Sequence, residues 1–439
     1  MAKVRTTFTC QNCGYQSSDW LGRCPQCGQW NTLVETVEEG VSSVRTEGGV
    51  RLVRKPQSLI SLAKSRLART STGSEEFDRV LGGGIVPGSV VLLAGDPGIG
   101  KSTLLLQLAA KLDGLYVAGE ESAEQIKIRA DRVGLKVSGL KVLVETDVDA
   151  IVTSLNEYKP KLAVVDSIQT LETVDLNSSA GSVGQIRECA ARLIRVAKES
   201  QIPVFLIGHV TKEGVVAGPR VLEHLVDTVL YLEGDEQHLF RVLRATKNRF
   251  GPTDEIGVFE MADKGMIEVK DPSAAFLAER VEAPGSVVVP TMEGSRPVLV
   301  EIQALTSASS IGIPRRTALG VDYNRVQLLT AVLQKRAGLQ LSSQDIFVSV
   351  AGGLKITEPA VDLAICLAIA SATFGRPLKP GLTAIGEVGL LGEIRSVRGL
   401  DKRVSEARKR GFKLFLTPDK VRTLRQAIAL ALASKEEVI

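Results

Sequence analysis

The chain has 439 residues, of which 44% are hydrophobic, and a formal net charge of +4. This length exceeds what one hydrophobic core usually serves, so we expect about two or three domains. The near balance of charge excludes a global positive field, and nucleic-acid contacts would have to come from local patches. The first five residues lack the apolar core of a secretory signal, and the longest apolar stretch, 360–374, contains Asp362 and is too short to span a bilayer. We therefore expect a soluble, cytoplasmic protein without a membrane partner.

Four of the six cysteines form two tight pairs near the N-terminus, and a glycine follows each pair: Cys10, Cys13 and Gly14, then Cys24, Cys27 and Gly28. Two Cys-x-x-Cys pairs supply four thiolates that can surround one zinc ion as a tetrahedron. A redox dithiol, the alternative, usually has a single such pair beside a strand and helix. We predict a structural zinc module over residues 1–35, because four protein ligands leave no open position for catalysis.

Residues 36–70 have the composition of a linker, acidic and Gly-rich at first and then basic. The basic part contains six cations with no acid among them: Arg51, Arg54, Lys55, Lys64, Arg66 and Arg69. Such a run either contacts phosphates or is simply a solvated linker, and the sequence leaves both open.

Residues 71–270 alternate apolar runs of strand length with helical stretches. Buried strands are expected at 90–94, 115–118, 162–165 and 204–207, helices at 101–112 and 183–199, and further strands at 229–232, 239–245 and 256–260. This alternation is typical of a parallel sheet covered on both faces.

A phosphate-binding loop is predicted between the first of these strands and the first helix: Gly95, Asp96, Pro97, Gly98, Ile99, Gly100, Lys101 and Ser102. Its glycines let backbone N–H groups curl around phosphates, and the helix N-terminus adds a favourable dipole. We expect Lys101 to contact the β- and γ-phosphates and Ser102 to ligate Mg²⁺, with Thr103 as a neighbour in the same site. ATP and Mg²⁺ are the predicted cofactors.

Two carboxylates are expected to complete this site. Asp166 ends the apolar run 162–165, on the ligand side of an open α/β sheet, and would support the magnesium through water. Glu120 and Glu121 follow the strand at 115–118, and Glu120 is our candidate for the group that orients or deprotonates the attacking water. The alternative is that both glutamates cap the helix expected to start near Ala123.

The pattern changes after residue 270, and a separate α/β domain over 271–439 is the economical interpretation. Strands are expected at 286–289, 298–304, 346–350 and 413–416, and helices at 323–337, 360–372 and 402–410.

With these residues placed, the central region resembles the RecA-like ATPases, including the approach from Thr72-Gly73 through 81–84 to Gly88. The stretch Lys247-Asn248-Arg249-Phe250-Gly251, the four-cysteine module in front and a Lon-like domain behind make the whole chain resemble the bacterial RadA family, also called Sms. That resemblance implies an α/β fold: a RecA-like P-loop ATPase core with an N-terminal zinc-ribbon-like module and a C-terminal Lon-protease-like α/β domain.

The resemblance also implies roles for single residues. Glu120 matches the carboxylate that polarises the attacking water, and His209 matches the position that senses the γ-phosphate, although a core histidine is the simpler reading of the sequence alone. Lys247 and Arg249 match cations that reach across a subunit boundary toward the neighbour's ATP, where they stabilise charge on the transferring phosphoryl group. A surface basic cluster is the alternative for these two.

Two polar segments, 177–184 and 210–220, match loops that contact DNA in RecA-like proteins. The cations available there are Lys212, Arg220 and Arg187. Loops of this kind are often plain connectors, which remains the alternative.

The C-terminal region resembles the proteolytic domain of Lon through 300–304 and 356–364. Lon proteases place a nucleophilic serine after the proline and a lysine base on a later Gly-Leu-Lys segment, whereas this chain has Ala360 and Asp401 there. Without hydroxyl or amine there is no nucleophile and no base, and neither Ser371 nor Lys402 matches the motif. We expect a scaffold for oligomerisation and DNA contact, with these candidate phosphate contacts: Arg315, Arg316, Arg325 and the cluster from Lys402 to Lys413.

Our leading interpretation is a DNA-dependent ATPase that assembles as a hexameric ring, translocates on DNA as a helicase and promotes branch migration in recombinational repair. The expected partners are single-stranded and branched DNA, the RecA recombinase and further copies of the chain. The alternative is an ATP-gated DNA-binding clamp or signalling oligomer that does not unwind DNA. An ATP-dependent protease is disfavoured by Ala360 and Asp401.

Overall fold

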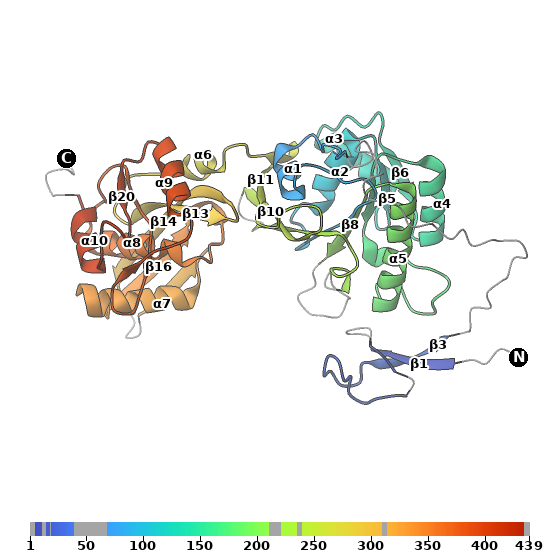
Figure 1. Cartoon of the computed structure of the whole chain (residues 1–439), viewed down its shortest axis with the longest axis horizontal. Helices are drawn as coiled ribbons and strands as arrows, with labels where there is room; N and C mark the ends of the chain where they lie inside the picture. The colour runs from blue at the N-terminus through green and yellow to red at the C-terminus, as the bar shows by residue number, and fades with distance from the viewer. Residues whose placement is uncertain are drawn as a thin grey trace, which may run out of the picture. The chain divides into compact units, whose positions relative to one another are not determined.

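The computed structural model describes residues 5–10, 15–17, 19–38, 68–209, 221–234, 239–309 and 314–433. The chain divides into two compact units (Figure 1). The first comprises Met1–Glu233, Leu243–Thr253 and Met261–Ile267, and the second comprises Gly234–Val242, Asp254–Glu260 and Glu268–Ile439. Within the described ranges, no helix combines the length and apolar character that a membrane-spanning segment requires.

The N-terminal cysteine module is built on a small antiparallel sheet of order β2-β1-β3. The strands are β1 (Arg5–Cys10), β2 (Gln16–Ser17) and β3 (Leu33–Glu38). Among the module's described residues, those that are buried are Cys10, Cys24 and Leu33. So little apolar surface cannot by itself stabilise a fold, and modules of this size usually depend on a metal or disulfides.

A nine-stranded sheet of order β12-β11-β10-β9-β4-β8-β7-β5-β6 lies mostly in the first unit, while parts of β10, β11 and β12 belong to the second. The strands from β9 to β6 in this order pair in parallel. Their bounds are β4 (Val90–Gly95), β5 (Leu115–Ala118), β6 (Lys141–Val144), β7 (Ala163–Asp166), β8 (Val204–His209), β9 (Thr228–Glu233), β10 (Phe240–Asn248), β11 (Ile256–Ala262) and β12 (Gly265–Glu268).

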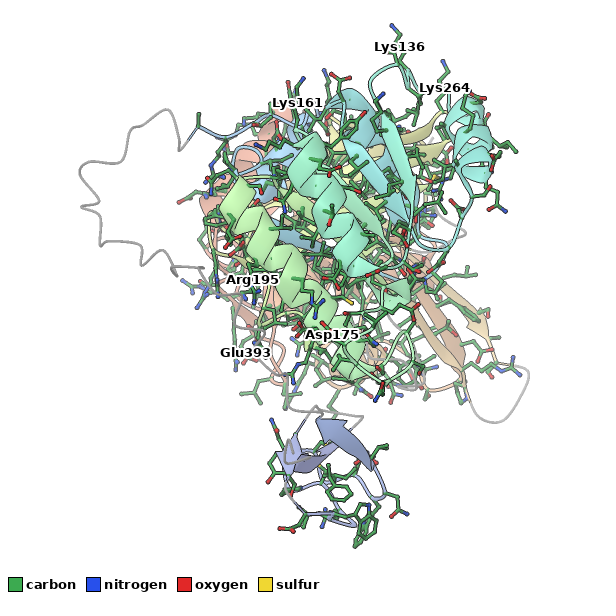
Figure 2. All side chains as sticks on the ribbon, turned by 90° about the vertical axis from the view of Figure 1, so that its right-hand side faces the viewer. Lys136, Lys161, Asp175, Arg195, Lys264 and Glu393 are labelled. Atoms are coloured by element: carbon green, nitrogen blue, oxygen red, sulfur yellow. The ribbon has the colours of Figure 1, made fainter. Side chains whose placement is uncertain are left out.

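Helices cover both faces of the parallel part of the sheet: α1 (Glu75–Leu81), α2 (Lys101–Lys111), α3 (Ala123–Arg132), α4 (Val148–Tyr158) and α5 (Val183–Ser200). Alternate strand residues such as Leu92 and Leu206 join the apolar faces of α4 and α5 in one core cluster. On the opposite face the Phe77 ring of α1 lies 6.0 Å from that of Phe205. Because both faces are buried, these strands are continuously apolar. Charged side chains such as Arg195 on α5 point outward (Figure 2).

The second unit has a six-stranded mixed sheet of order β15-β16-β14-β13-β17-β20 and a small hairpin, β18 with β19. Its strands are β13 (Ser286–Glu293), β14 (Arg296–Ala308), β15 (Arg316–Leu319), β16 (Gln344–Val350), β17 (Leu382–Ala384), β18 (Glu387–Val388), β19 (Ile394–Arg395) and β20 (Leu414–Leu416). Its helices are α6 (Pro272–Leu277), α7 (Tyr323–Val332, continued by a π-helical turn, Leu333–Ala337), α8 (Asp362–Phe374), α9 (Leu400–Lys409) and α10 (Leu424–Ala431).

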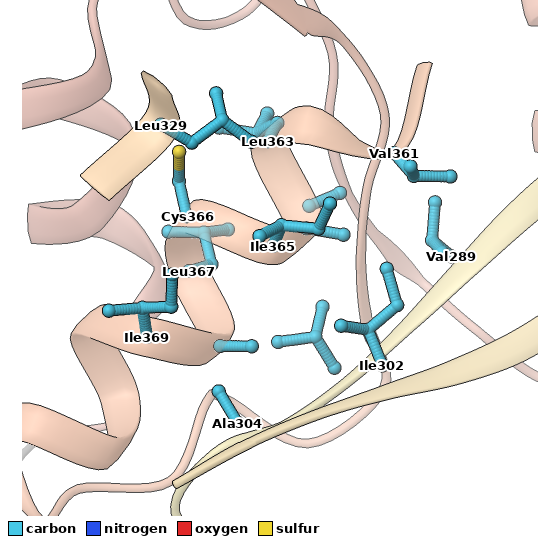
Figure 3. Close-up of a cluster of buried hydrophobic side chains, with 14 of the residues drawn as sticks. Val289, Ile302, Ala304, Leu329, Val361, Leu363, Ile365, Cys366, Leu367 and Ile369 are labelled. Atoms are coloured by element: carbon cyan, nitrogen blue, oxygen red, sulfur yellow. The ribbon is translucent and has the colours of Figure 1, made fainter. Parts of the chain in front are cut away.

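Helix α8 is the centre of the second unit's core. Ten consecutive residues from Asp362 to Ser371 are buried, which explains why the helix is apolar on every side. Figure 3 shows Leu363, Ile365 and Ile369 of α8 packed among side chains that include Ile302 of β14. The long apolar stretch of the sequence is therefore a core helix.

Candidate nucleotide site and zinc centre

The predicted phosphate loop connects the buried strand β4 to helix α2. Its glycines adopt backbone conformations that L residues rarely take, with φ of 152° at Gly95 and 109° at Gly100. A Cβ atom at Gly95 would lie 2.5 Å from the Leu232 carbonyl oxygen, and one at Gly100 would lie 2.5 Å from the Met261 side chain. Glycine is therefore required at both positions, and the loop can bring its N–H groups close to a phosphate.

Lys101 is buried at the first position of α2, with 3% of its surface exposed. Its Nζ donates hydrogen bonds of 2.8 Å to the carbonyl oxygens of Gly95 and Asp96. Burial lowers the pKa of Lys101 to about 8, although the charges of Asp166, Asp96 and Glu120 favour the ammonium form. A phosphate at the loop would add negative charge and favour that form further.

Carboxylates and a hydroxyl converge in a small pocket of about 60 Å³ beside this loop. It is lined by Ser102, Ala118, Glu120, Glu121, Arg129, Asp166 and His209. Glu120 accepts a 2.8 Å hydrogen bond from the buried Ser167 hydroxyl, which fixes one of its oxygens. The sheet brings Asp166 beside β5, where it pairs with Ala118. The structure thus brings together the predicted Ser102, Glu120, Asp166 and His209.

Two residues of this site, Tyr116 and Arg129, are absent from the sequence-based prediction. The fully buried Tyr116 hydroxyl donates to Oδ2 of Asp166. Arg129 Nη2 donates to the Tyr116 hydroxyl at 3.3 Å and lies 2.7 Å from Glu121 Oε2. Burial and the Asp166 charge raise the pKa of Tyr116 well above its ordinary value, so the phenol stays protonated and remains a donor.

Helix capping does not account for Glu120 and Glu121. The N-cap of α3 is Ser122, whose side chain accepts from Gln125 N while the Gln125 side chain accepts from Ser122 N. This capping box satisfies the helix end without either glutamate. Both carboxylates instead line the pocket.

His209 ends β8 and lines the same pocket. Burial and the neighbouring Lys101 charge lower the pKa of His209, which leaves the imidazole neutral near pH 7. A neutral imidazole offers one N–H donor, the group that a contact to a phosphate oxygen needs.

The donor set at this pocket fits Mg²⁺ with a nucleotide triphosphate. Mg²⁺ prefers oxygen ligands and retains several waters, and the Ser102 hydroxyl with the Asp166 carboxylate supplies few, hard oxygens beside an anion-binding loop. The bound metal would supply positive charge that offsets the negative charge of the phosphates. Lys101, Ser102 and Asp166 would hold the metal nucleotide, and Glu120 would orient the water.

Lys247 and Arg249 are not among the residues that line this pocket. Lys247 Nζ, at the end of β10, donates to three carbonyl oxygens, those of Glu223 at 2.7 Å, Val226 at 2.9 Å and His224 at 3.4 Å. The Arg249 side chain is 56% exposed and lies 3.3 Å from the buried Asp227 carboxylate. Of these two cations, Arg249 is the one whose side chain is largely exposed to solvent.

Two other residues of this motif have a structural role that the sequence did not indicate. Asn248 Nδ2 donates to the Leu81 carbonyl at 3.2 Å, and its Oδ1 accepts from Phe250 N at 3.0 Å. A Cβ at Gly251 would lie 3.0 Å from Gly82 Cα. The motif thereby packs against the end of α1.

Three candidate phosphate contacts have partners within the chain. Arg69 is exposed and donates to the carbonyls of Leu81 and Phe250. Arg325 is half-buried and pairs with the buried Asp362. Arg403, inside the Lys402 to Lys413 cluster, is 2% exposed, so its guanidinium is the one of the three that is inaccessible to a phosphate.

The other candidate DNA contacts differ in accessibility. Arg187, Arg315 and Lys402 are exposed, whereas Arg316 is half-buried and donates to the Gln344 and Leu341 carbonyls. Of the remaining candidates, Arg408, Lys409, Arg410 and Lys413 of the C-terminal cluster are exposed. The others lie outside the described residues: Arg51, Arg54, Lys55, Lys64, Arg66 and the loop at 210–220 with Lys212 and Arg220.

The positions that match the Lon nucleophile and base carry neither a hydroxyl nor an amine. Ala360 is buried beside α8, and Asp401 is exposed in the first turn of α9. Ser371 is fully buried, accepts from Gly285 N at 2.9 Å and donates to the Arg376 carbonyl at 2.5 Å. With its hydroxyl used as both donor and acceptor, Ser371 cannot replace the missing nucleophile.

The N-terminal cysteines converge as a metal site requires. The Sγ atoms of Cys10, Cys24 and Cys27 lie within 4.8 Å of one another, and those of Cys10 and Cys27 are 3.6 Å apart. Sulfur atoms of a tetrahedral zinc site with Zn–S bonds of about 2.3 Å are roughly 3.8 Å apart, so this spacing fits zinc. The predicted fourth ligand, Cys13, lies outside the described residues.

Removing zinc from the full chain is expected to unfold the cysteine module and leave the two α/β sheets folded, because the module has little other core. Both tryptophans of the chain, Trp20 and Trp30, belong to this module, so their fluorescence reports on it alone. Chelation should change the tryptophan emission and leave the helical circular dichroism unchanged. Loss of helical signal in step with zinc release would contradict this expectation.

Comparison with known families agrees with this architecture. Residues 8–35 match the rubredoxin metal binding domain family, residues 62–215 the AAA domain family and residues 302–421 the family of subunit ChlI of Mg-chelatase. The crystal structure of the RadB recombinase aligns with a TM-score of 0.37 and 25% identity, over 46% of this chain and 99% of that one.

Whole-length relatives show the family directly. The chain is 53% identical over 427 residues to the DNA repair protein RadA of Bacillus subtilis, which covers 95% of this chain and 93% of that protein. It is 51% identical over 423 residues to RadA of Listeria monocytogenes, with coverage of 95% and 93%. The predicted fold class, with its RecA-like ATPase core between a zinc module and a Lon-like domain, is confirmed. The chain therefore belongs to the RadA family of DNA repair proteins.

Proposed function

We propose that the chain is a DNA-dependent ATPase that assembles into a hexameric ring, translocates on single-stranded DNA as a helicase and promotes branch migration alongside the RecA recombinase. The names of its relatives support a role in DNA repair. The observation that carries the proposal concerns Arg249. Its side chain is exposed and does not line the pocket, which otherwise contains the carboxylates and the hydroxyl that a metal nucleotide needs.

One chain supplies the pocket with Asp166, the carboxylate proposed to support Mg²⁺, and with Glu120, the glutamate proposed to orient the water. Arg129 lines the pocket and is bound to Glu121 and Tyr116, and Lys101 of the adjacent phosphate loop is bound to loop carbonyls. Phosphoryl transfer needs positive charge on the transferring group, and an arginine from a neighbouring subunit commonly supplies it. The exposed Arg249 guanidinium is suited to that task in a ring.

Lys247 is a second candidate for this role in trans. It would have to exchange its three carbonyl acceptors for a phosphate of the neighbour, which a favourable ion pair can offset. In the part of the chain that the structure describes, Arg249 has one ion pair to release, and its partner Asp227 would keep Lys198, so Arg249 is the stronger candidate of the two.

Contact with DNA is proposed for the segment 177–184 and the nearby exposed Arg187, with the loop at 210–220. The exposed Arg315 and Lys402 are proposed contacts of the Lon-like domain, which we propose acts as an oligomerisation and DNA-binding scaffold without proteolytic activity. Phosphate contacts of this kind would make binding fall steeply with salt.

Measuring ATP hydrolysis with and without single-stranded DNA, and strand displacement on a branched substrate, tests the proposal. We expect DNA to raise the hydrolysis rate and ATP to drive displacement. Absence of stimulation together with absence of DNA binding in an ATP analogue would refute it. DNA binding without displacement would instead identify the ATP-gated clamp or signalling oligomer.

The role of Arg249 in trans gives a specific prediction. Arg249→Ala is expected to lower the turnover number by about 1,000-fold or more, with a much smaller effect on ATP binding. Mixing Arg249→Ala chains with Lys101→Ala chains should restore part of the activity, because some interfaces then combine an intact loop with an intact arginine. Activity that no mixing ratio restores would remove the support for a shared site.

A further inference from the structure

We propose that Tyr116 and Arg129 are positioning residues for the Asp166 carboxylate, and that they thereby set the affinity of the nucleotide site for its divalent cation. This inference rests on the proposed nucleotide site and adds two residues to it. Neither residue belongs to the phosphate loop, and both reach Asp166 from elements beside β7.

The sheet places Tyr116 within reach of the Asp166 carboxylate on the neighbouring strand. β5 and β7 are parallel neighbours, with Tyr116 paired to Val164 and Ala118 paired to Asp166. Tyr116 and Asp166 are therefore diagonal neighbours on one face of the sheet, a separation that a tyrosine side chain spans. Its hydroxyl donates to Asp166 Oδ2, which leaves Oδ1 as the oxygen with capacity for a metal-bound water.

Arg129 reaches the same carboxylate from helix α3. The buried Ile126 and Ala130 anchor that helix to the sheet, and Arg129 lies on the same side, three residues after Ile126. Its Nη2 is 3.3 Å from the Tyr116 hydroxyl and 3.9 Å from Asp166 Oδ2. The resulting chain of donors runs in one direction, from the guanidinium to the phenol and from the phenol to the carboxylate, so each bond strengthens the next.

A buried tyrosine needs an acceptor, and satisfying that need is the simpler explanation of the contact. Two features indicate that the contact also has a role at the metal site. The acceptor is the carboxylate expected to support Mg²⁺, and Arg129, which orients the phenol, itself lines the pocket with Ser102 and Glu120. Partners that hold a metal-site carboxylate typically change metal affinity by 10–100-fold when removed, whereas a purely structural bond would change stability alone.

The test is the binding of Mn²⁺ to the full-length chain with ADP, followed by electron paramagnetic resonance. Tyr116→Phe removes only the hydroxyl and is expected to raise the half-saturating Mn²⁺ concentration by about 10-fold. Arg129→Met should raise it in the same direction, and the double variant should show less than the product of the two effects, because both act through one chain of bonds. The ATPase rate of Tyr116→Phe should recover at high Mg²⁺.

Two matched controls separate this role from general damage. Tyr158→Phe makes the same chemical change at an exposed position of α4, and Lys127→Ala removes an exposed cation two residues before Arg129 on α3. Both should bind Mn²⁺ with ADP as the wild type does. Thermal unfolding should show that Tyr116→Phe remains folded at the assay temperature.

The outcomes distinguish this inference from the proposed function. An unchanged half-saturating Mn²⁺ concentration in Tyr116→Phe would overturn the positioning role, whatever the ATPase activity of the wild type. A wild-type chain that binds Mn²⁺ with ADP and shows no DNA-stimulated hydrolysis would contradict the proposed function alone, since the binding measurement needs neither hydrolysis nor DNA.

Discussion

Replacing Glu120 by glutamine is expected to lower kcat for ATP hydrolysis by at least about 100-fold, with little change in nucleotide affinity. The amide keeps an oxygen that can accept the 2.8 Å hydrogen bond from the Ser167 hydroxyl, so the side chain should retain its position. It loses the negative charge and the basic oxygen that the proposed role in orienting and deprotonating water requires. Steady-state hydrolysis and equilibrium binding of a fluorescent ADP analogue measure the two effects separately.

The matched control is Glu124→Gln, which removes a carboxylate from the first turn of α3 on the exposed side of the helix. That variant should hydrolyse ATP at close to the wild-type rate. A larger loss in Glu121→Gln than in Glu120→Gln would transfer the water-orienting role to Glu121, whose oxygen the structure instead shows 2.7 Å from the Arg129 guanidinium.

The parts of the nucleotide site that could be predicted are those encoded locally. The phosphate loop is continuous in sequence, and Asp166 and Glu120 each follow a buried apolar strand, so the ligand edge of a parallel sheet brings them together. Tyr116 and Arg129 gave no such signal. Tyr116 lies within an apolar strand, Arg129 resembles any cation on an amphipathic helix, and only the adjacency of β5 and β7 joins them to Asp166.

For the fold as well, the elements that could be predicted are those with a strong local sequence pattern. Long apolar or strongly amphipathic segments were predicted nearly to their ends, as with α2 and α5. β6 was missed because it lies at the edge of the sheet with Val142 and Val144 exposed, and it lacks the alternation of a half-buried strand. α4 was missed although its buried residues, Val148, Ile151 and Leu155, have helical spacing.

The partners of cations could not be predicted where they are distant in sequence. Arg325 was a candidate phosphate contact and Arg403 lies within a candidate cluster, and each pairs with a carboxylate that is more than 30 residues away. Glu358 belongs to the segment that resembles the Lon nucleophile motif, and Arg403 lies two residues after Asp401, the position that matches the Lon base. In this chain an ion pair joins the segments that in Lon carry the nucleophile and the base.

Arg403→Met is expected to destabilise the second unit by about 3 kcal/mol, because it removes a buried guanidinium and leaves the half-buried Glu358 carboxylate with hydrogen bonds from the Thr291 hydroxyl and Met292 N but without its ion pair. Arg403 is 2% exposed, and its guanidinium donates to both Glu358 oxygens, to the Pro290 carbonyl at 2.8 Å and to the Arg398 carbonyl at 3.0 Å. Burial alone would raise the pKa of Glu358, and Arg403 holds it below its ordinary value, so Glu358 stays charged at neutral pH. Hydrogen exchange of the β13 amides, read by mass spectrometry, measures the loss within this unit.

Two variants test whether burial is the cause. Arg410→Met breaks exposed pairs with Asp271 and Glu406 in the same unit and should cost no more than about 1 kcal/mol. The double variant Arg403→Met with Glu358→Met should be more stable than Arg403→Met alone, because it removes the unpaired Glu358 carboxylate and fills the space with apolar groups. If Arg403→Met proved no more damaging than Arg410→Met, the Glu358 carboxylate would have to be solvated, and the ion pair could not be what joins the two Lon-like segments.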